Sequence, residues 1–228
     1  MKRSSLTKMP QWETGAGMPI RLHMRNDLHL VRKTFHMVMG LLIAFIYLSG
    51  LSCTMGVMIL SCALGVDLLI ETTRLRSPSI NERVMKVWGP FMRNCEVSKL
   101  SGTPYYILAA IFAVGIFPKP VAILSILYLA CGDPLASLVG ILYGSKSFKI
   151  AQGKSLIGTM AGVVTCAFIT FIYLKSLNLG DSTVLILTLV GGLAGGTAEL
   201  LPFDIDDNFT IPVISGFVMW LAFILLGI

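Results

Sequence analysis

The stretch Tyr128–Gly162, which reads YLACGDPLASLVGILYGSKSFKIAQGKSLIGTMAG, decides the fold of this chain. It places one carboxylate, Asp133, inside an apolar run long enough to cross a bilayer. A short basic connection with Lys146, Lys149 and Lys154 follows, and then a second apolar run rich in small residues begins. A carboxylate inside a membrane-spanning helix costs about 2.5–3.5 kcal/mol on insertion scales, so its presence indicates a functional site.

The composition predicts a polytopic membrane protein. Hydrophobic residues make up 55% of the 228 positions, charged residues make up 13%, and the mean hydropathy is +0.80. A soluble domain of this length would be more polar. The net charge of +6 comes from basic residues between the apolar runs, which favours a membrane surface over nucleic acid as the partner. The five cysteines show no CxxC spacing, so we expect them to act as small hydrophobic side chains.

The apolar runs predict an all-α fold with about seven transmembrane helices in residues 34–228. The spans are expected at Thr34–Gly50, Leu51–Ile70, Pro104–Phe117, Val121–Tyr143, Leu156–Leu174, Thr183–Leu201 and Thr210–Gly227. The polar stretch Glu71–Lys99 carries apolar residues at helical spacing, which predicts an interfacial amphipathic helix. Residues 1–33 are expected to form a basic segment at the membrane surface, without a cleavable signal peptide.

The lysines and arginines predict the orientation of the spans. With the N-terminus in the cytoplasm, the inner segments are 1–33, 71–103, 144–155 and 202–209, and they hold 16 of the 18 basic residues. This is the bias expected of cytoplasmic connections. Asp133, Glu199 and the loop 202–208 are then expected near the cytoplasmic face, where nucleotides and Mg²⁺ are available.

Glycines at four-residue spacing predict faces on which helices approach closely. The pairs are Gly140 with Gly144, Gly158 with Gly162, and Gly191/Gly192 with Gly195/Gly196. The glycines from Gly132 to Gly144 have an alternative use, because glycine also admits a ligand close to the backbone.

Asp133 is followed by Pro134, which removes one backbone N–H and frees a carbonyl group within the helix. A broken helix beside a carboxylate suits a polar cavity. One interpretation is an ion pair with a lysine that holds two helices together. The other is a magnesium ligand or a general base for a hydroxyl group.

Lys154 lies in the sequence Gly153-Lys154-Ser155, which ends like a P-loop but lacks its first glycine, because Phe148 stands there. Lys154 directly precedes a span, where free N–H groups and the positive end of the helix dipole favour a phosphate. Lys146 and Lys149 add charge to this site or contact anionic lipids.

A third polar cluster lies between the last two spans and comprises Glu199, Asp204, Asp206, Asp207 and Asn208. Closely spaced carboxylates suit a hard cation that neutralises a triphosphate. A solvated acidic loop without a bound cation would show the same sequence pattern. At the start of the first span, Arg32, Lys33 and His36 serve as interfacial anchors or bind a phosphate.

These residues together resemble a known family. CGDPLASLVGILYGSKSF followed by GKSLIGT is similar to the signature of the dolichol kinase, phytol kinase and CTP-dependent diacylglycerol kinase family. RKTFH at 32–36, KLSGTPYY at 99–106 and DIDDNFTIPVISG at 204–216 resemble further elements of that family. Ile157 departs from the pattern, because many members carry an acidic residue there.

The resemblance implies transfer of the γ-phosphate of CTP to the hydroxyl group of a lipid alcohol, with Mg²⁺ as cofactor. The resemblance implies roles for Asp133, Lys154, Asp207 and Asn208, with Arg32 and Lys33 contributing. Taken with the patterns above, we expect catalytic roles for Asp133, Lys154 and Asp207; nucleotide or phosphate binding by Arg32, Lys33, Gly140, Lys146, Lys154, Ser155 and Asn208; and metal binding by Asp133, Glu199 and Asp207. The acceptor is expected to be a polyprenol, a phytol-type isoprenoid or diacylglycerol. Nothing in the sequence specifies an oligomeric state.

Two alternatives compete with the kinase hypothesis. The segment from Asp133 to Lys154 also resembles phosphatidate cytidylyltransferase, which makes CDP-diacylglycerol from CTP. The strings KDxxxxxPGHGG and DRxDS that are typical of that family do not occur here. A transporter or scaffold that uses Asp133 and Glu199 as an ion path is the second alternative, and it predicts charges near the middle of the bilayer.

Overall fold

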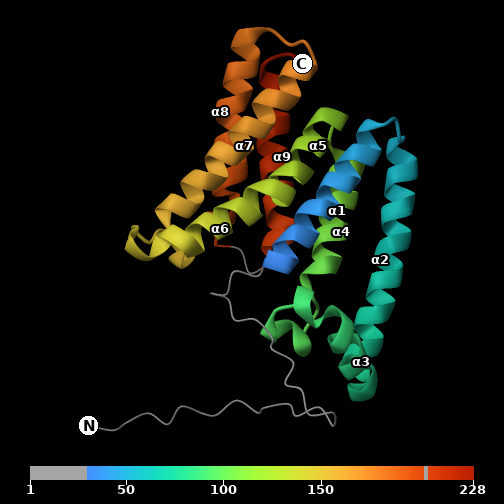
Figure 1. Cartoon of the computed structure of the whole chain (residues 1–228). Helices are drawn as coiled ribbons and strands as arrows, with labels where there is room; N and C mark the ends of the chain where they lie inside the picture. Colours follow the sequence, from blue (N-terminus) through green and yellow to red (C-terminus); the bar gives the residue numbers. More distant parts are fainter. Residues whose placement is uncertain (1–29, 203–204) are drawn as a thin grey trace.

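A computed structural model describes residues 30–202 and 205–228 of the chain, and every regular element within these ranges is a helix (Figure 1). The expected all-α fold is therefore confirmed. The basic residues before Leu30, together with Asp204, lie outside the described residues. The long helices are α1 (Leu30–Leu48), α2 (Cys53–Arg76), α3 (Pro78–Trp88), α4 (Gly102–Ile116), α5 (Lys119–Leu127), α6 (Asp133–Tyr143), α7 (Leu156–Ser176), α8 (Asp181–Thr197) and α9 (Asp207–Leu225).

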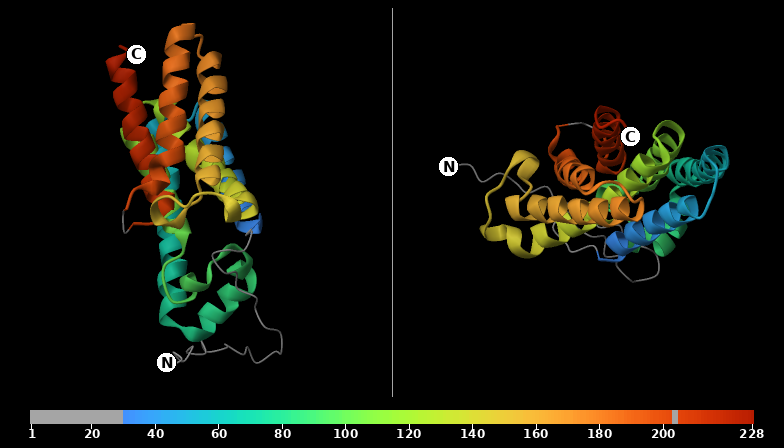
Figure 2. Two further views of the ribbon diagram at one scale, coloured as in Figure 1. Left: turned by 90° about the vertical axis from the view of Figure 1, so that its left-hand side faces the viewer. Right: turned by 90° about the horizontal axis from the view of Figure 1, so that it is seen from above.

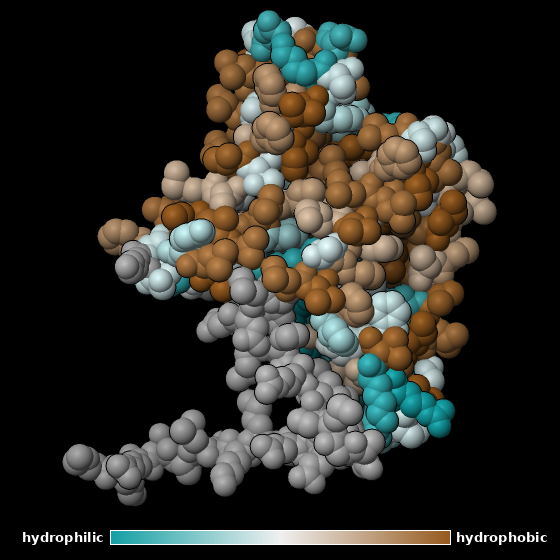
Figure 3. All heavy atoms as spheres, in the orientation of Figure 1, coloured by the Kyte–Doolittle hydropathy of each residue, from teal (hydrophilic) through white to brown (hydrophobic). Residues whose placement is uncertain are grey.

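Six helical segments in the described ranges are long and apolar enough to cross a membrane. The remaining expected span, Pro104–Phe117, corresponds to α4, which has only 15 residues. At 1.5 Å per residue such a helix is about 23 Å long, which is shorter than the ~30 Å hydrocarbon core of a bilayer. In Figure 3, hydrophobic residues cover most of the helical surface on the face shown, and hydrophilic residues gather towards its ends.

The continuous segment Lys119–Tyr143 lies at the centre of the bundle. Of its most apolar window, 67% is buried inside the protein, whereas the corresponding value for α2 is 6%. Figure 2 shows α1, α7 and α9 arranged around this segment, while α2 lies at the edge. The span that carries Asp133 is thus enclosed by the other helices.

This central segment departs from α-helical geometry directly before Asp133. Residues Tyr128–Gly132 form a π-helical turn, and the backbone N–H of Asp133 donates to the carbonyl oxygen of Tyr128, five positions earlier. Pro134 follows in the first turn of α6 and has no N–H to continue an α-helical pattern. The helix expected to break at Asp133-Pro134 is instead continuous and carries a π-turn there, and π-turns of this kind are frequent at functional sites.

Glycine-mediated packing holds α6, α7 and α8 together. A Cβ atom on Gly158 would lie 2.9 Å from the Cα atom of Gly140 and 2.8 Å from the carbonyl oxygen of Ala136, so α6 and α7 touch through their backbones. Gly162 of α7 similarly faces Gly196 of α8. The close helix contacts predicted from the glycine spacing are confirmed.

The polar stretch after the second span differs in its boundaries from the prediction. Helix α2 continues through Glu71 to Arg76, and the amphipathic helix is α3, with Val87 and Trp88 exposed. Helix α2 can continue past Ile70 because Glu71 and Arg74 are both buried and bind each other.

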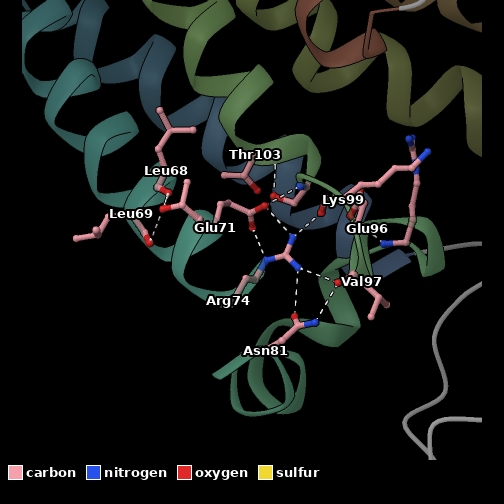
Figure 4. A network of polar contacts seen from close by, with 12 residues as sticks. Leu68, Leu69, Glu71, Arg74, Asn81, Glu96, Val97, Lys99 and Thr103 are labelled. Atoms are coloured by element: carbon pink, nitrogen blue, oxygen red, sulfur yellow. Dashed lines mark hydrogen bonds and ion pairs between the residues drawn. The ribbon is translucent and has the colours of Figure 1, made fainter. Parts of the chain in front are cut away.

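That pair is the centre of a polar network at the end of α2 (Figure 4). The guanidinium group of Arg74 donates to both carboxylate oxygens of Glu71 at 2.8 and 2.7 Å, and to the carbonyl oxygens of Val97 at 3.3 Å and Lys99 at 2.8 Å. Glu71 also accepts the backbone N–H of Ser101 at 2.9 Å. The network thereby fixes residues 97–101, which lead into α4.

Candidate functional site

Three segments that are distant in sequence meet around Lys154. This residue lies in the connection between α6 and α7, Glu199 lies on the 3₁₀ turn η6 (Ala198–Leu200) after α8, and Asp207 begins α9. The Nζ atom of Lys154 is 2.7 Å from Oε2 of Glu199 and 3.5 Å from Oδ2 of Asp207. In the sequence these residues belong to two separate clusters, and the fold brings the clusters together.

The carboxylate of Asp133 belongs to the same group. Its charge interacts with those of Lys154, Asp207, Arg93 and Arg32. We refer to Asp133, Glu199 and Asp207, with Lys154 among them, as the acidic cluster. Across the described ranges, no three histidine, cysteine or carboxylate side chains are arranged as a ready-made metal site.

The acidic cluster keeps Lys154 protonated. Burial, the strongest influence, acts to lower the pKa of this amine. The attraction of Glu199, Asp133 and Asp207, together with the hydrogen bond to Glu199, outweighs burial and raises the pKa above its usual 10.5. Lys154 is therefore a cation at every physiological pH, suited to stabilising phosphate charge rather than to accepting a proton.

The first turns of α1 bring a second group of charges. Arg32 is buried and pairs with Glu96 of η2 (Asn94–Val97), with Nη1 and Oε1 3.5 Å apart. The Nζ atom of Lys33 is buried and has no hydrogen-bond partner among the described residues, although its charge interacts with that of Asp133. We call Arg32, Lys33 and the nearby Arg93 the basic cluster.

Asn208 connects this region to α4. Its Nδ2 atom donates to the carbonyl oxygen of Gly102 at 3.2 Å, and its own backbone N–H is capped by Oδ1 of Asp206 at 2.9 Å. A Cβ atom on Gly102 would collide with the amide of Asn208 and lie 3.0 Å from Nη2 of Arg32. Asn208 and Arg32 therefore converge on one glycine at the start of α4.

Other expected site residues have packing contacts. The hydroxyl group of Ser155 accepts the backbone N–H of Gly158 at 3.2 Å and so caps α7. Gly140 faces Ser155 and Gly158 at the α6–α7 crossing. The side chain of Lys146, which ends the 3₁₀ turn η4 (Gly144–Lys146), lies outside the described part of the structure. Their predicted contacts with a nucleotide stay predictions.

Two charged residues next to Arg32 were not predicted from the sequence. Arg93 and Glu96 come from the polar stretch after α3, and the charge of Arg93 interacts with Asp133, Arg32 and His36. A lone arginine in a basic connection gives no signal of this placement. Only the path of the chain after the Glu71–Arg74 network brings residues 93–97 beside α1.

Comparison with known proteins identifies the relatives of this chain. No family model matches, and no solved structure matches. CTP-dependent diacylglycerol kinase 1 of Saccharomyces cerevisiae is 29% identical over 206 residues, covering 82% of this chain and 71% of the yeast protein. Its counterpart in Eremothecium gossypii is 32% identical over 206 residues, covering 82% of this chain and 65% of that protein.

A chloroplastic farnesol kinase of Arabidopsis thaliana is 29% identical over 207 residues, covering 86% of this chain and 66% of the plant protein. The chain thus spans about two thirds of the length of these relatives. All three proteins are lipid kinases by name, and the matched region includes most of the helical bundle. Over most of its length the chain is therefore similar to CTP-dependent diacylglycerol kinases and to a farnesol kinase, at 29–32% identity.

Proposed function

We propose that this chain is a CTP-dependent lipid kinase that transfers the γ-phosphate of CTP to the hydroxyl group of a lipid alcohol. The observation that carries the proposal is the convergence of Asp133, Lys154 and Asp207, from three distant segments, beside the basic cluster. Negative and positive groups placed side by side suit phosphoryl transfer, in which positioning and charge stabilisation supply most of the catalysis.

In the proposed reaction the lipid hydroxyl oxygen attacks the γ-phosphorus of CTP. The bond to the β,γ-bridging oxygen breaks, CDP leaves, and the hydroxyl proton passes to a carboxylate, for which Asp133 is the candidate. Its position after the π-turn supports this role, because the turn presents a carboxylate from inside the membrane-spanning segment. Lys154 stabilises the negative charge that develops on the leaving CDP.

Mg²⁺ would bind at the acidic cluster through some of the carboxylates of Asp133, Glu199 and Asp207. Their oxygens are the hard ligands that this ion prefers, and Mg²⁺ is commonly held by one or two carboxylates together with substrate phosphates rather than by a complete protein cage. This preference accounts for the incomplete metal site in the described residues. When bound, the ion would neutralise phosphate charge.

The acceptor is proposed to be diacylglycerol or an isoprenoid alcohol, in line with the named substrates of the relatives. Its tail would remain in the hydrocarbon layer between helices while the hydroxyl group reaches Asp133. The proposed site faces the cytoplasm. In support, the starts of α1, α4 and α9 and the end of α2 all lie at one end of the bundle, opposite the C-terminus (Figure 1, Figure 2), and this end carries most of the basic residues.

The test is to incubate membranes containing the protein with γ-labelled CTP and a mixture of diacylglycerol, polyprenol and phytol. Label in an extracted lipid is the expected result. Label released as pyrophosphate would instead support the cytidylyltransferase alternative, and no turnover with any acceptor or nucleotide would contradict the kinase hypothesis. Substituting ATP, GTP and UTP in parallel reactions tests the preference for CTP.

A further inference from the structure

Arg93 belongs to the basic cluster but lies in none of the sequence motifs that predict the site. Its Nη1 atom is 3.9 Å from Oδ2 of Asp206, close to the upper limit for an ion pair, and 43% of its side chain is exposed. Its charge nevertheless interacts with Asp133 in α6 and with Arg32 and His36 in α1. The guanidinium group is thus near the site, and its ion pair within the described residues is a long one.

The carboxylate of Glu96 contacts both Arg93 and Arg32 and so keeps them close to each other. Oε2 of Glu96 accepts the backbone N–H of Arg93 at 2.9 Å, while Oε1 of Glu96 pairs with the guanidinium group of Arg32. The positive charges of the two guanidinium groups repel each other. Holding two like charges together is unfavourable for the protein alone and becomes favourable when an anion binds between them.

The loop that carries Arg93 is fixed from its other side. Arg74, which is fully buried, donates to the carbonyl oxygens of Val97 and Lys99, and Asn81 donates to the same carbonyl oxygen of Val97 at 3.0 Å. These contacts, drawn in Figure 4, tie residues 97–99 to α2 and α3. Because the loop is anchored immediately after Glu96, Arg93 is positioned before any ligand arrives.

The neighbouring Lys33 supplies an independent observation that points to an anion. Its ammonium nitrogen is buried without a hydrogen-bond partner in the described residues, a state that costs free energy unless a ligand completes it. Glu96 and Asp206 offset part of the positive charge of Arg32, and Asp206 that of Arg93. Glu96 is shared between two arginines, and Asp206 uses one oxygen to cap α9.

We infer that Arg93 is a further phosphate-binding residue, which together with Arg32 and Lys33 holds the triphosphate chain of the nucleotide. On binding, the guanidinium group exchanges its long contact with Asp206 for charge-assisted hydrogen bonds to phosphate oxygens. The basic cluster then binds the phosphate chain from the α1 side, and Lys154 binds it from the α7 side. This inference rests on the proposed lipid kinase activity.

The experiment compares Arg93→Ala and Arg93→Lys with the wild-type protein in purified, detergent-solubilised form, with CTP and the lipid acceptor varied separately. For Arg93→Ala, the KM for CTP is expected to rise roughly tenfold to a hundredfold, because one charge-assisted contact to phosphate is lost. The KM for the lipid is expected to stay within about twofold, and lysine is expected to recover part of the CTP affinity.

Arg83→Ala is the matched control, because Arg83 is an exposed arginine on α3 and the substitution removes the same charge. Asp206→Asn separates a structural role from phosphate binding, since asparagine still caps α9 but no longer attracts Arg93. An unchanged KM for CTP in Arg93→Ala would overturn the inference, as would a defect of equal size in Asp206→Asn or a rise confined to the KM for the lipid. An inactive wild-type protein would instead overturn the proposed function.

Discussion

The ammonium group of Lys154 and the carboxylate of Glu199 are 2.7 Å apart although 45 positions separate the two residues. Their side chains are 22% and 7% exposed, so this ion pair is largely removed from solvent. It joins the connection before α7 to the end of α8, and the 3.5 Å contact with Asp207 extends it to α9. One lysine thus links three segments of the proposed active site.

Replacing Lys154 by alanine should lower phosphoryl transfer at least about a hundredfold, because a preorganised cation no longer stabilises the leaving CDP. It should also destabilise the fold by about 3–5 kcal/mol, since Glu199 becomes an uncompensated buried charge. Turnover of labelled CTP measures the first effect, and chemical denaturation in detergent micelles measures the second. Lys86→Ala is the control, because Lys86 and Glu82 form an exposed pair on α3 whose loss should cost about 0–1 kcal/mol.

The double variant Lys154→Ala with Glu199→Gln separates catalysis from packing. Neutralising Glu199 removes the uncompensated charge, so we expect much of the lost stability to return while turnover stays low. Recovery of turnover along with stability would show that Lys154 only holds helices together.

The pKa of Lys154 predicts how the site responds to alkaline conditions. Because the pKa in the folded protein is raised above the usual 10.5, the stabilising contribution of the charged amine is fully present below about pH 10.5 and is lost only as pH rises through the folded value. The stability difference between the wild-type protein and Lys154→Gln should therefore be constant from pH 7 to 10 and shrink above that range. A difference that already declines near pH 8 would contradict the assigned protonation state.

Asp133→Asn preserves the size of the side chain and removes its charge. We expect it to abolish lipid phosphorylation while the protein still accumulates in membranes, because the residue lies beside the π-turn at the centre of the charged cluster. Asp181→Asn provides a matched control: the side chain of Asp181 is 90% exposed and pairs with Lys175 between α7 and α8. Phosphorylation retained in Asp133→Asn would exclude this carboxylate from the mechanism.

Much of the fold could be predicted from local patterns. The apolar runs predicted six of the spans, Asp133-Pro134 predicted an irregularity in the central helix, and the glycine spacing predicted the α6–α7 and α7–α8 contacts. These features depend on short-range properties of the backbone, such as the missing N–H of proline and the missing side chain of glycine. Such properties act wherever the residue occurs.

The charged contacts between segments were less predictable. The sequence predicts a polar interfacial stretch from Glu71 onwards, but Arg74 is fully buried there because its guanidinium group donates to the carbonyl oxygens of Val97 and Lys99. Arg93 similarly reaches the site through a path that no local pattern encodes. Long-range pairs of this kind depend on the path of the connections that bring distant segments together, and hydrophobic periodicity does not specify that path.

Gly102→Ala tests whether the start of α4 positions the basic cluster. An added Cβ atom would collide with the amide of Asn208 and lie 3.0 Å from Nη2 of Arg32, so it should displace both side chains. We expect an overpacking cost of about 1–3 kcal/mol, seen by chemical denaturation, together with a rise in the KM for CTP, because Arg32 moves. Gly65→Ala is the control: nothing lies within 4 Å of a Cβ atom there, and alanine favours the helix by up to about 1 kcal/mol. If Gly102→Ala lowers stability while the KM for CTP stays at the wild-type value, the contact between Gly102 and Asn208 serves packing alone, and Arg32 does not depend on it for its position.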